Sequence, residues 1–261
     1  MRILITNDDG VNAKGIYFLT KELEAHYECI VVAPDKQRSA AGHSITLHRP
    51  ITVKKVRIEG IKSMVYSVDG KPADCVKVAI EKLLNEKVDL IISGINNGYN
   101  LGTDVLYSGT VSAAVEGAIY KIPSIAVSVD FDADEEYLKR AAKISKEIAE
   151  RAFNNLKDDV VLNVNIPKDE TNKGIKVCIL GNRVYKNAYI EEDTHNDVER
   201  RFQPGGTVVD VDDGNSDVFY IKQGYITVTP LHYDLTNFNI IAQVNSWLTE
   251  EESKWKKFMR I

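Results

Sequence analysis

The sequence predicts an α/β fold in which helices cover both faces of a mostly parallel β-sheet. Short apolar runs alternate with amphipathic segments that have helical spacing along most of the chain. Strands that alternate with helices of this length form βαβ units, and such units build parallel sheets. The chain has 261 residues, of which 44% are hydrophobic, so it can bury a large core. We therefore expect one α/β domain over residues 1–261.

The elements follow in order along the core, which we place at residues 1–180. Short aliphatic and β-branched runs predict strands at Ile3–Thr6, Cys29–Ala33, Val88–Ser93, Ser124–Val129 and Val160–Ile166. Apolar residues at helical spacing predict helices at Ile16–Leu23, Lys77–Leu84, Val111–Tyr120 and Tyr137–Phe153. Between the second strand and second helix, Ile51–Val56 and Met64–Val68 are β-rich and flank Glu59-Gly60, which predicts a hairpin.

The alternation ends near Gly181, and residues 181–261 are expected to form a β-rich C-terminal arm, a strand and a tail helix that serve oligomerisation. Residues 181–217 are polar and rich in loop-forming residues, and a strand is expected at Gly224–Pro230. The tail from Ile240 to Trp255 is mildly amphipathic, which favours a packed or exchanged helix. The acidic run Asp210–Asp217 lacks the glycine position and closing glutamate of a calcium loop, so we interpret it as a solvated turn.

Composition excludes several classes of protein. The formal net charge of −5 and the pI near 5.6 argue against a surface for polymeric nucleic acid. The three cysteines Cys29, Cys75 and Cys178 are widely spaced and suggest buried thiols in a reducing compartment. No run is long enough to span a bilayer, and the amino terminus lacks a signal-peptide pattern, so we expect a cytoplasmic protein without a membrane partner.

Two adjacent carboxylates, Asp8 and Asp9, follow the first predicted strand directly. Taken alone, Asn-Asp-Asp-Gly is more typical of an ordinary solvated turn. However, ligands of open α/β sheets collect at the carboxyl ends of the strands, and a first strand-to-helix turn often presents them. Gly10 allows the chain to bend there, so that both carboxylates can approach one ion. An acidic turn repels phosphate, so it can handle phosphate only through a metal ion.

Polar loops after two further strands supply more oxygen ligands. The loop after the second strand contains Ser39, and the loop after Val88–Ser93 contains Asn96. Loops that follow parallel strands emerge at the same edge of the sheet. Carboxylate, hydroxyl and amide oxygens suit a hard cation rather than zinc. The sequence therefore predicts one Mg²⁺ or Mn²⁺ per subunit, bound by Asp8, Asp9, Ser39 and Asn96.

A helix start after the third loop provides a candidate phosphate site. Ser108 is a suitable N-cap for the helix Val111–Tyr120, and Gly109 permits close approach of the backbone. The free amides of Ser108, Gly109 and Thr110 could then bind an anion. A capped helix without a ligand is an equally good interpretation of this segment alone.

Five motifs, in this order, resemble those of the SurE (stationary-phase survival protein) family, whose members are metal-dependent nucleotidases. They are ITNDDG ending at Gly10, APDKQRSAAGHS ending at Ser44, GKPADCV from Gly70, SGINNG from Ser93 and YSGTVSAA from Tyr107. The likeness covers Met1 to about Asp130 and resumes from Gly224 to Leu231. It implies a Rossmann-like, three-layer α/β/α core, and it assigns the metal to Asp8, Asp9, Ser39 and Asn96.

The resemblance also implies an activity and an assembly. Family members release phosphate from nucleoside 5′-monophosphates, and to varying degrees from 3′-monophosphates and short polyphosphate. They form homodimers or homotetramers by exchanging C-terminal elements, which would explain the long arm. We expect Asp8, Asp9, Asn96 and His43 to be catalytic, with Asp8 orienting the attacking water and His43 protonating the leaving ribose oxygen.

Two alternatives remain open at the level of sequence. The main activity could be that of an exopolyphosphatase, or the chain could be a metal-dependent nucleotide sensor without turnover. The aromatic residues Tyr99 and Tyr107 could stack a base, although packing explains them equally well.

Overall fold

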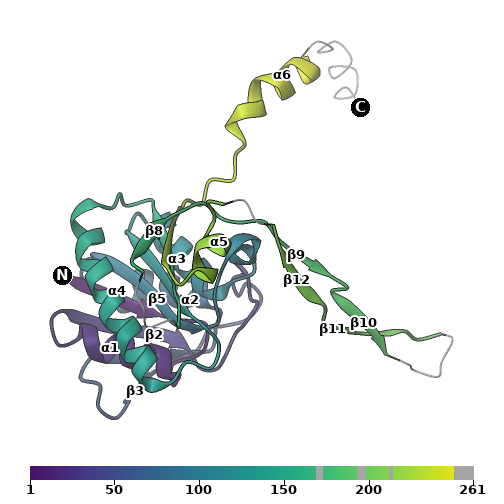
Figure 1. The fold of residues 1–261 in the computed structure, drawn as a ribbon. Coiled ribbons are helices and arrows are strands. Elements are labelled where there is room, and N and C mark those ends of the chain that lie inside the picture. Colours follow the sequence, from purple (N-terminus) through teal and green to yellow (C-terminus); the bar gives the residue numbers. More distant parts are fainter. Residues whose placement is uncertain (169–172, 193–197, 212–213, 250–261) are drawn as a thin grey trace.

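The chain folds around one large sheet, from which a β-ribbon and a C-terminal helix project (Figure 1). In this computed structural model, the structure describes residues 1–168, 173–192, 198–211 and 214–249. The strands of the large sheet are β1 (Arg2–Thr6), β2 (Glu28–Pro34), β3 (Val53–Val56), β4 (Met64–Val68), β5 (Leu90–Asn97), β6 (Ser124–Val129), β7 (Val161–Ile166), β8 (Ile175–Val177) and β13 (Ile226–Leu231). The α-helices are α1 (Lys14–Leu23), α2 (Pro72–Val78), α3 (Gly109–Ile119), α4 (Glu135–Asn155), α5 (Asp217–Lys222) and α6 (Ile241–Thr249).

The sheet is mostly parallel and has the order β3-β4-β2-β1-β5-β6-β7-β13-β8. The six strands from β4 to β7 in this order pair in parallel. β3 runs antiparallel to β4, and β13 runs antiparallel to β7. β1 lies between β2 and β5. The strands that follow β1 directly in the chain, β2 to β4, are added on one side of it, and the later strands β5 to β7 are added on the other side. A crevice at such a switch point is where open α/β sheets bind ligands.

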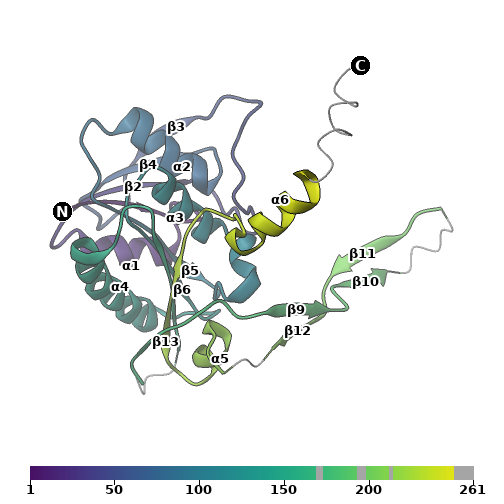
Figure 2. The ribbon, with the colours of Figure 1, turned by 90° about the horizontal axis from the view of Figure 1, so that it is seen from above.

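Helices cover both faces of the sheet, which confirms the predicted three-layer α/β/α class (Figure 2). Successive strand residues point to opposite faces. Ile3 and Ile5 of β1 join the core cluster that contains α1 and α4 residues, whereas Leu4 joins the cluster that contains α2 and α3 residues. Apolar residues therefore alternate between two cores within a single strand, as expected for a sheet that is buried on both sides.

Most predicted elements are present, but the second helix begins earlier than expected. The β3–β4 hairpin forms as predicted. The helix expected at Lys77–Leu84 instead begins at Pro72 and continues after Val78 as a π-helical turn, η1 (Ala79–Leu83). Proline is well suited to the first turn of a helix, because that turn needs no amide donor. Asp74 also accepts a hydrogen bond from the Lys71 amide at 2.8 Å, which caps the first turn.

The polar stretch after Gly181, expected as a β-rich arm, contains an antiparallel ribbon in its described residues. β9 (Arg183–Lys186) pairs with β12 (Thr207–Asp210), and β10 (Tyr189–Glu192) pairs with β11 (Arg201–Pro204). The ribbon extends away from the core (Figure 1). Its local pattern is polar because most of its residues are exposed on both faces, which hides the alternation that marks a strand.

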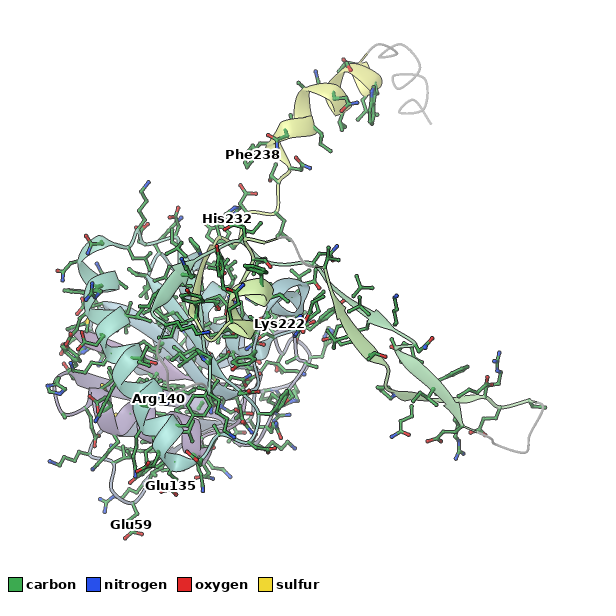
Figure 3. All side chains as sticks on the ribbon, viewed as in Figure 1. Glu59, Glu135, Arg140, Lys222, His232 and Phe238 are labelled. Atoms are coloured by element: carbon green, nitrogen blue, oxygen red, sulfur yellow. The ribbon has the colours of Figure 1, made fainter. Side chains whose placement is uncertain are left out.

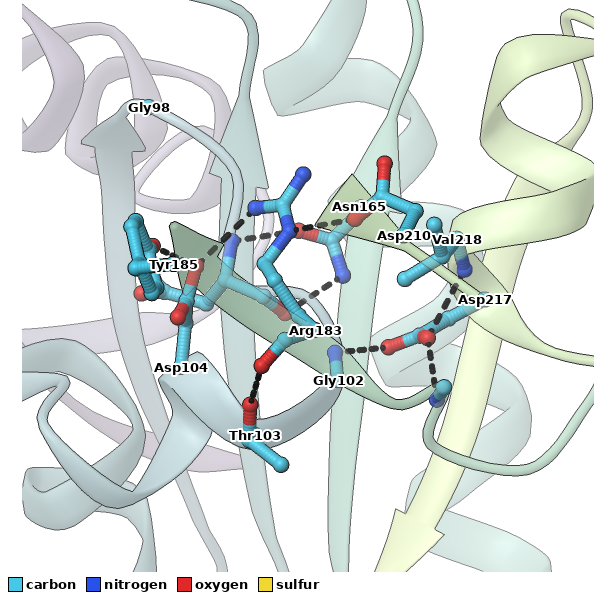
Figure 4. A network of polar contacts seen from close by, with 12 residues as sticks. Gly98, Gly102, Thr103, Asp104, Asn165, Arg183, Tyr185, Asp210, Asp217 and Val218 are labelled. Atoms are coloured by element: carbon cyan, nitrogen blue, oxygen red, sulfur yellow. Dashed lines mark hydrogen bonds and ion pairs between the residues drawn. The ribbon is translucent and has the colours of Figure 1, made fainter. Parts of the chain in front are cut away.

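An ionic network fixes the root of this ribbon to the core (Figure 4). The Arg183 guanidinium lies 2.9 Å from a carboxylate oxygen of Asp104 and 2.9 Å from one of Asp210. The Tyr185 hydroxyl also donates to Asp104, and Lys222 pairs with Asp210 at 2.7 Å. Asp104 belongs to the 3-10 helix η2 (Gly102–Leu106), so the ribbon is bound to the segment that leads into α3.

The interpretation of Asp210–Asp217 as a solvated turn is wrong at both of its ends. Asp210 takes part in the ionic network described above. Asp217 is fully buried, and its carboxylate accepts hydrogen bonds from the amides of Gly102, Gly181 and Val218, each at 2.8 Å. These backbone donors satisfy a buried carboxylate without a cation.

The C-terminal segment leaves the core before it forms α6. Phe238 lies in the short helix η3 (Phe238–Ile240) on this projecting segment (Figure 3). None of the nine residues of α6 is buried. The rest of the expected tail helix, from residue 250, lies outside the described residues. Within the described ranges, no helix has both the length and the apolar character needed to cross a membrane.

Candidate active site

The predicted site residues gather at the carboxyl ends of β1, β2 and β5, next to the first turn of α3. This is the switch point of the sheet, because β1 separates β2 from β5. The turn after β1 carries Asp8 and Asp9 and bends at Gly10, which has a positive φ of 99°. The Asn7 side chain closes this turn through two hydrogen bonds to the backbone of Gly10. These bonds close a bend in which Gly10 adopts its positive φ without the steric cost that a side chain would add.

Asp8 lies against the start of α3. Its side chain is almost completely buried, and its Oδ1 accepts a hydrogen bond from the Thr110 hydroxyl. A Cβ atom at Gly109 would lie 2.7 Å from the Asp8 Cβ and 2.8 Å from its Oδ2. Only glycine therefore lets the helix approach this carboxylate so closely. The helix start and the acidic turn are therefore in direct contact.

Asp9 connects the loops after β2 and β5. Its Oδ2 accepts a hydrogen bond from the Asn97 amide at 3.2 Å, and its Oδ1 accepts one from the Gln37 side chain at 3.3 Å. The same Gln37 nitrogen donates to the Ser39 hydroxyl at 2.9 Å. One donor thus joins Asp9 and Ser39, which places the second and third predicted ligands close together.

Asn96 stands at the end of β5, beside Asn97. Its side-chain nitrogen donates to the Gly98 carbonyl at 2.7 Å. This bond orients the amide group and leaves its carbonyl oxygen as the atom available to a cation. Asn96 is half-buried, at an irregularity where the β5–β6 register shifts between Ser93 and Asn96. A register shift of this kind re-aims side chains at the end of a strand.

Ser108 caps α3, as predicted. Its hydroxyl accepts a hydrogen bond from the Val111 amide at 3.0 Å. The cap satisfies the Val111 amide, and the backbone of Thr110 donates to the Asp8 carboxylate, so the partial positive charge of the helix start at Gly109 and Thr110 faces the acidic turn. Both residues are buried beside Asp8. The first turn can therefore bind an anion that approaches the acidic turn.

The side chain of His43 contacts a carboxylate on α3. Its Nε2 lies 2.8 Å from a carboxylate oxygen of Glu116, which also pairs with Lys77 at 3.3 Å. Glu116 is seven residues after Gly109, or roughly 10 Å further along α3. The role of His43 as a proton donor stays a prediction, and its contact with Glu116 gives the histidine a second, structural role.

The electrostatics of the acidic pair fit a divalent cation. Burial raises the pKa of Asp8 from 3.8 to about 6, the Thr110 hydrogen bond opposes this shift, and the neighbouring charge of Asp9 adds to it. Burial also raises the pKa of Asp9. The raised pKa values mean that the charged forms of both carboxylates are not compensated by a nearby positive charge. A bound cation would supply that charge. No cluster of three or more histidine, cysteine, aspartate or glutamate side chains occurs in the described ranges, so the remaining ligands here would be neutral oxygens.

These shifts predict how pH affects the stability of the metal-free protein. Because the pKa of Asp8 is higher in the folded state, the folded state binds more protons between about pH 4 and 6. The carboxyl group therefore costs stability as the pH rises through this window. We expect Asp8→Asn to stabilise the metal-free protein more at pH 7.5 than at pH 4, with a difference of about 2 kcal/mol. Urea unfolding of the EDTA-treated proteins at both pH values measures it, and an equal effect at the two values would contradict it.

A sequence comparison identifies the family. The family model described as "Survival protein SurE" matches residues 3–187, which include all the site residues above. The chain belongs to the SurE family. The resemblance of the five motifs is thereby confirmed, together with the expected fold.

Several SurE relatives resemble the chain over nearly its whole length. A protein of Clostridium botulinum (strain ATCC 19397 / Type A), named 5′-nucleotidase SurE, is 49% identical over 247 residues, which are 93% of this chain and 97% of that protein. A protein of the same name from Clostridium beijerinckii is 48% identical over 249 residues, covering 94% and 98%. The crystal structure of the SurE protein from Aquifex aeolicus has a TM-score of 0.81 at 36% identity, and the match covers 95% of this chain and 99% of that one.

Three contributors to this SurE site were missed at the level of sequence. Gln37 joins Asp9 to Ser39, and the Thr110 hydroxyl, rather than only its amide, contacts Asp8. Glu116, the charged residue of α3, accepts a hydrogen bond from His43. A single acidic residue among the apolar positions of α3 is a signal that could have been used, because buried carboxylates need partners. Gln37 carried no such signal.

Proposed function

We propose that this chain is a metal-dependent phosphomonoesterase that hydrolyses nucleoside 5′-monophosphates to nucleoside and phosphate. The main support is the buried Asp8 carboxylate in direct contact with the first turn of α3. This arrangement places a candidate cation site directly beside a candidate anion site, so a metal-bound phosphate group could contact both. The 5′-nucleotidase name of the SurE relatives supports the same activity.

We assign the cofactor to one Mg²⁺ or Mn²⁺, held by Asp8, Asp9, Ser39 and Asn96. The carboxylate, hydroxyl and amide oxygens of these residues are the ligand types that such cations prefer. When bound, the cation supplies Lewis-acid chemistry toward the phosphoryl group. The resemblance of the five motifs to the SurE family implies the same metal dependence.

We assign the other roles in the reaction to residues of the chain. The Gly109 amide and the partial positive charge of the first turn of α3 bind the phosphoryl oxygens and stabilise the charge that develops on them. Asp8 orients the attacking water, which forms a new P–O bond in line with the bond that breaks to the ribose oxygen. That oxygen takes up a proton as it leaves, and we assign the donor to His43. Because His43 pairs with Glu116, its side chain must leave this carboxylate before it can donate to the ribose oxygen.

Phosphate release from AMP tests this function. The EDTA-treated protein is expected to release no phosphate, and added Mn²⁺ or Mg²⁺ should restore the release. Release that is unaffected by EDTA would exclude metal dependence. Metal-dependent binding of AMP without release would identify a nucleotide sensor. Parallel assays with 3′-AMP and tripolyphosphate rank the other substrate classes, and a higher kcat/KM for tripolyphosphate would identify an exopolyphosphatase.

We also propose that the chain forms a homodimer or homotetramer through its C-terminal elements. Several large apolar side chains are exposed there, namely Tyr189, Ile190 and Phe202 on the ribbon and Leu235, Phe238 and Trp247 around α6. Projecting elements with exposed apolar residues are expected to pack against a partner. Light scattering on the intact protein tests this proposal, and a monomer mass would contradict it.

A further inference from the structure

The Ser39 loop, residues 35–48, connects the acidic turn with α2 and α3. Near its start, the Arg38 amide donates to the Asp8 carbonyl at 2.7 Å. Further along, the Gly42 amide donates to the Tyr107 carbonyl at 3.0 Å. Ser39 lies between these two bonds and is itself exposed. Its position therefore depends on how firmly both ends of the loop are held.

A buried carboxylate holds the far end of this loop. Asp74 is 3% exposed, and it accepts hydrogen bonds from the Thr46 amide at 3.0 and 3.1 Å and from the Thr46 hydroxyl at 2.7 Å. It also accepts the Lys71 amide at 2.8 Å, at the start of α2. One side chain thus joins the Ser39 loop to a helix start, and a charged acceptor makes each of these bonds stronger than a neutral one.

The helix that carries Asp74 is a rigid support next to the site. Its residues Cys75 and Val76 are fully buried in the core cluster on the α2–α3 face. A Cβ atom at Gly109 would lie 3.1 Å from the Pro72 side chain, so the start of α2 packs beside the start of α3. The anchor of the loop is therefore fixed relative to the phosphate site. Asp74 itself touches none of the four proposed metal ligands.

The contact between His43 and Glu116 holds the same loop at a second point. Glu116 is 4% exposed; burial opposes its ionisation, but the hydrogen bond from His43 and the charge of Lys77 prevail and lower its pKa. Glu116 therefore remains a charged acceptor. The two anchors lie on different helices, so the loss of one leaves the other in place.

We propose that Asp74 is a positioning residue for the cation site: it fixes the Ser39 loop and so holds the Ser39 hydroxyl within reach of Asp8 and Asp9. This inference rests on the proposed function, because it assumes that Ser39 is a metal ligand. The GKPADCV motif, which has no part in the proposed chemistry, thereby gains a role.

Asp74→Asn is the direct test. The Thr46 amide, the Thr46 hydroxyl and the Lys71 amide all reach Asp74 Oδ2, and the Thr46 amide also reaches Oδ1. Asparagine keeps the size of the side chain but removes the charge that strengthens these bonds and puts an NH₂ donor in place of one of the two oxygens, so the anchor weakens. We expect Mn²⁺ affinity to fall about 10-fold to 100-fold, as for other residues that orient metal ligands. At saturating Mn²⁺ we expect kcat to recover to within about threefold of the original value, because the variant retains all four ligands.

Glu24→Gln is a matched control in another part of the molecule. Glu24 follows α1, its side chain is 6% exposed, and it accepts hydrogen bonds from the Lys62 amide, the Ser63 amide and the Ser63 hydroxyl, each at 2.9 Å. It thus fixes a loop in the same manner as Asp74, but at the opposite edge of the sheet: Glu24 precedes β2 and Ser63 precedes β4, whereas the acidic turn follows the carboxyl end of β1. We expect its substitution to lower the Tm without changing Mn²⁺ affinity.

Isothermal titration of Mn²⁺ into the EDTA-treated proteins measures the effect without reference to turnover. Wild-type affinity in Asp74→Asn would overturn the inference, as would an equal loss in Glu24→Gln. Absence of Mn²⁺ binding to the wild-type protein would instead contradict the proposed function. If Asp74→Asn does not fold, Thr46→Ala removes only the hydroxyl partner, and a severalfold weaker Mn²⁺ affinity is then expected; an unchanged affinity would overturn the inference.

Discussion

Replacement of Asp8 by asparagine is expected to lower metal-dependent phosphate release by more than about a hundredfold. Loss of a residue that merely orients a metal ligand costs up to about a hundredfold, and Asp8 is proposed as a ligand itself. Asparagine keeps an oxygen that can accept the Thr110 hydroxyl, so the contact with α3 is preserved. The fold should therefore remain intact, and the activity should be lost through charge alone.

Asp134→Asn is a suitable control for this variant. Asp134 caps α4 by accepting the Tyr137 amide at 2.8 Å, and asparagine is an equally good cap. The same chemical change is thus made outside the acidic turn, and activity should be unaffected. Phosphate release from AMP at saturating Mn²⁺ and the Tm are measured for both variants. Asp8→Asn with near-normal turnover would remove Asp8 from the proposed mechanism.

Gly109→Ala is expected to have the second large effect. The added methyl group would lie 2.7 Å from the Asp8 Cβ, a separation that non-bonded carbon atoms do not adopt, so the acidic turn or the helix start must move. A displacement of about 1 Å in an active site can cost about a hundredfold in rate. We expect kcat/KM for AMP to fall by about that factor, while the far end of α3 keeps its packing.

Gly117→Ala separates this effect from general crowding of the helix. Gly117 lies on the same helix, and a Cβ there would meet the Ser124 hydroxyl at 2.3 Å and the Ile91 side chain at 2.6 Å, away from the acidic turn. It should lower the Tm through strain but leave kcat/KM of the folded protein within a few-fold. Equal losses of kcat/KM in both variants, measured well below their Tm values, would show that α3 acts only as a structural element.

The sequence predicted the core of the fold well because its signal is local and repeated. Apolar runs such as Ile3–Thr6 and Ser124–Val129 correspond to strands that are buried on both faces. Where the signal is weak, the prediction was less accurate. The ribbon strands β9 to β12 are mostly exposed on both faces, so they lack the apolar alternation that would locate each strand within the predicted β-rich arm. The position of Pro72 marked the start of α2 better than apolar spacing did.

The candidate site shows the same limit for polar residues. Asp8 and Asp9 could be recognised as candidate site residues from sequence, because a strand-to-helix turn seldom carries two adjacent carboxylates. Asp217 carried a similar local pattern, but its partners are amides of residues 102, 181 and 218, which only the fold brings together. A buried carboxylate and a solvated one therefore look alike in sequence, because partners distant in the chain decide between them.

The sequence by itself determined the alternation of strands and helices, the acidic turn, the hydroxyl and amide that join it, and the family that these motifs indicate. These properties depend on neighbouring residues along the chain. Tertiary structure alone decided that β1 lies between β2 and β5, that Gly109 contacts Asp8, and that Asp74 holds the loop of Ser39. Such contacts join residues far apart in the sequence, and their geometry is set by how helices pack on the sheet rather than by any local preference.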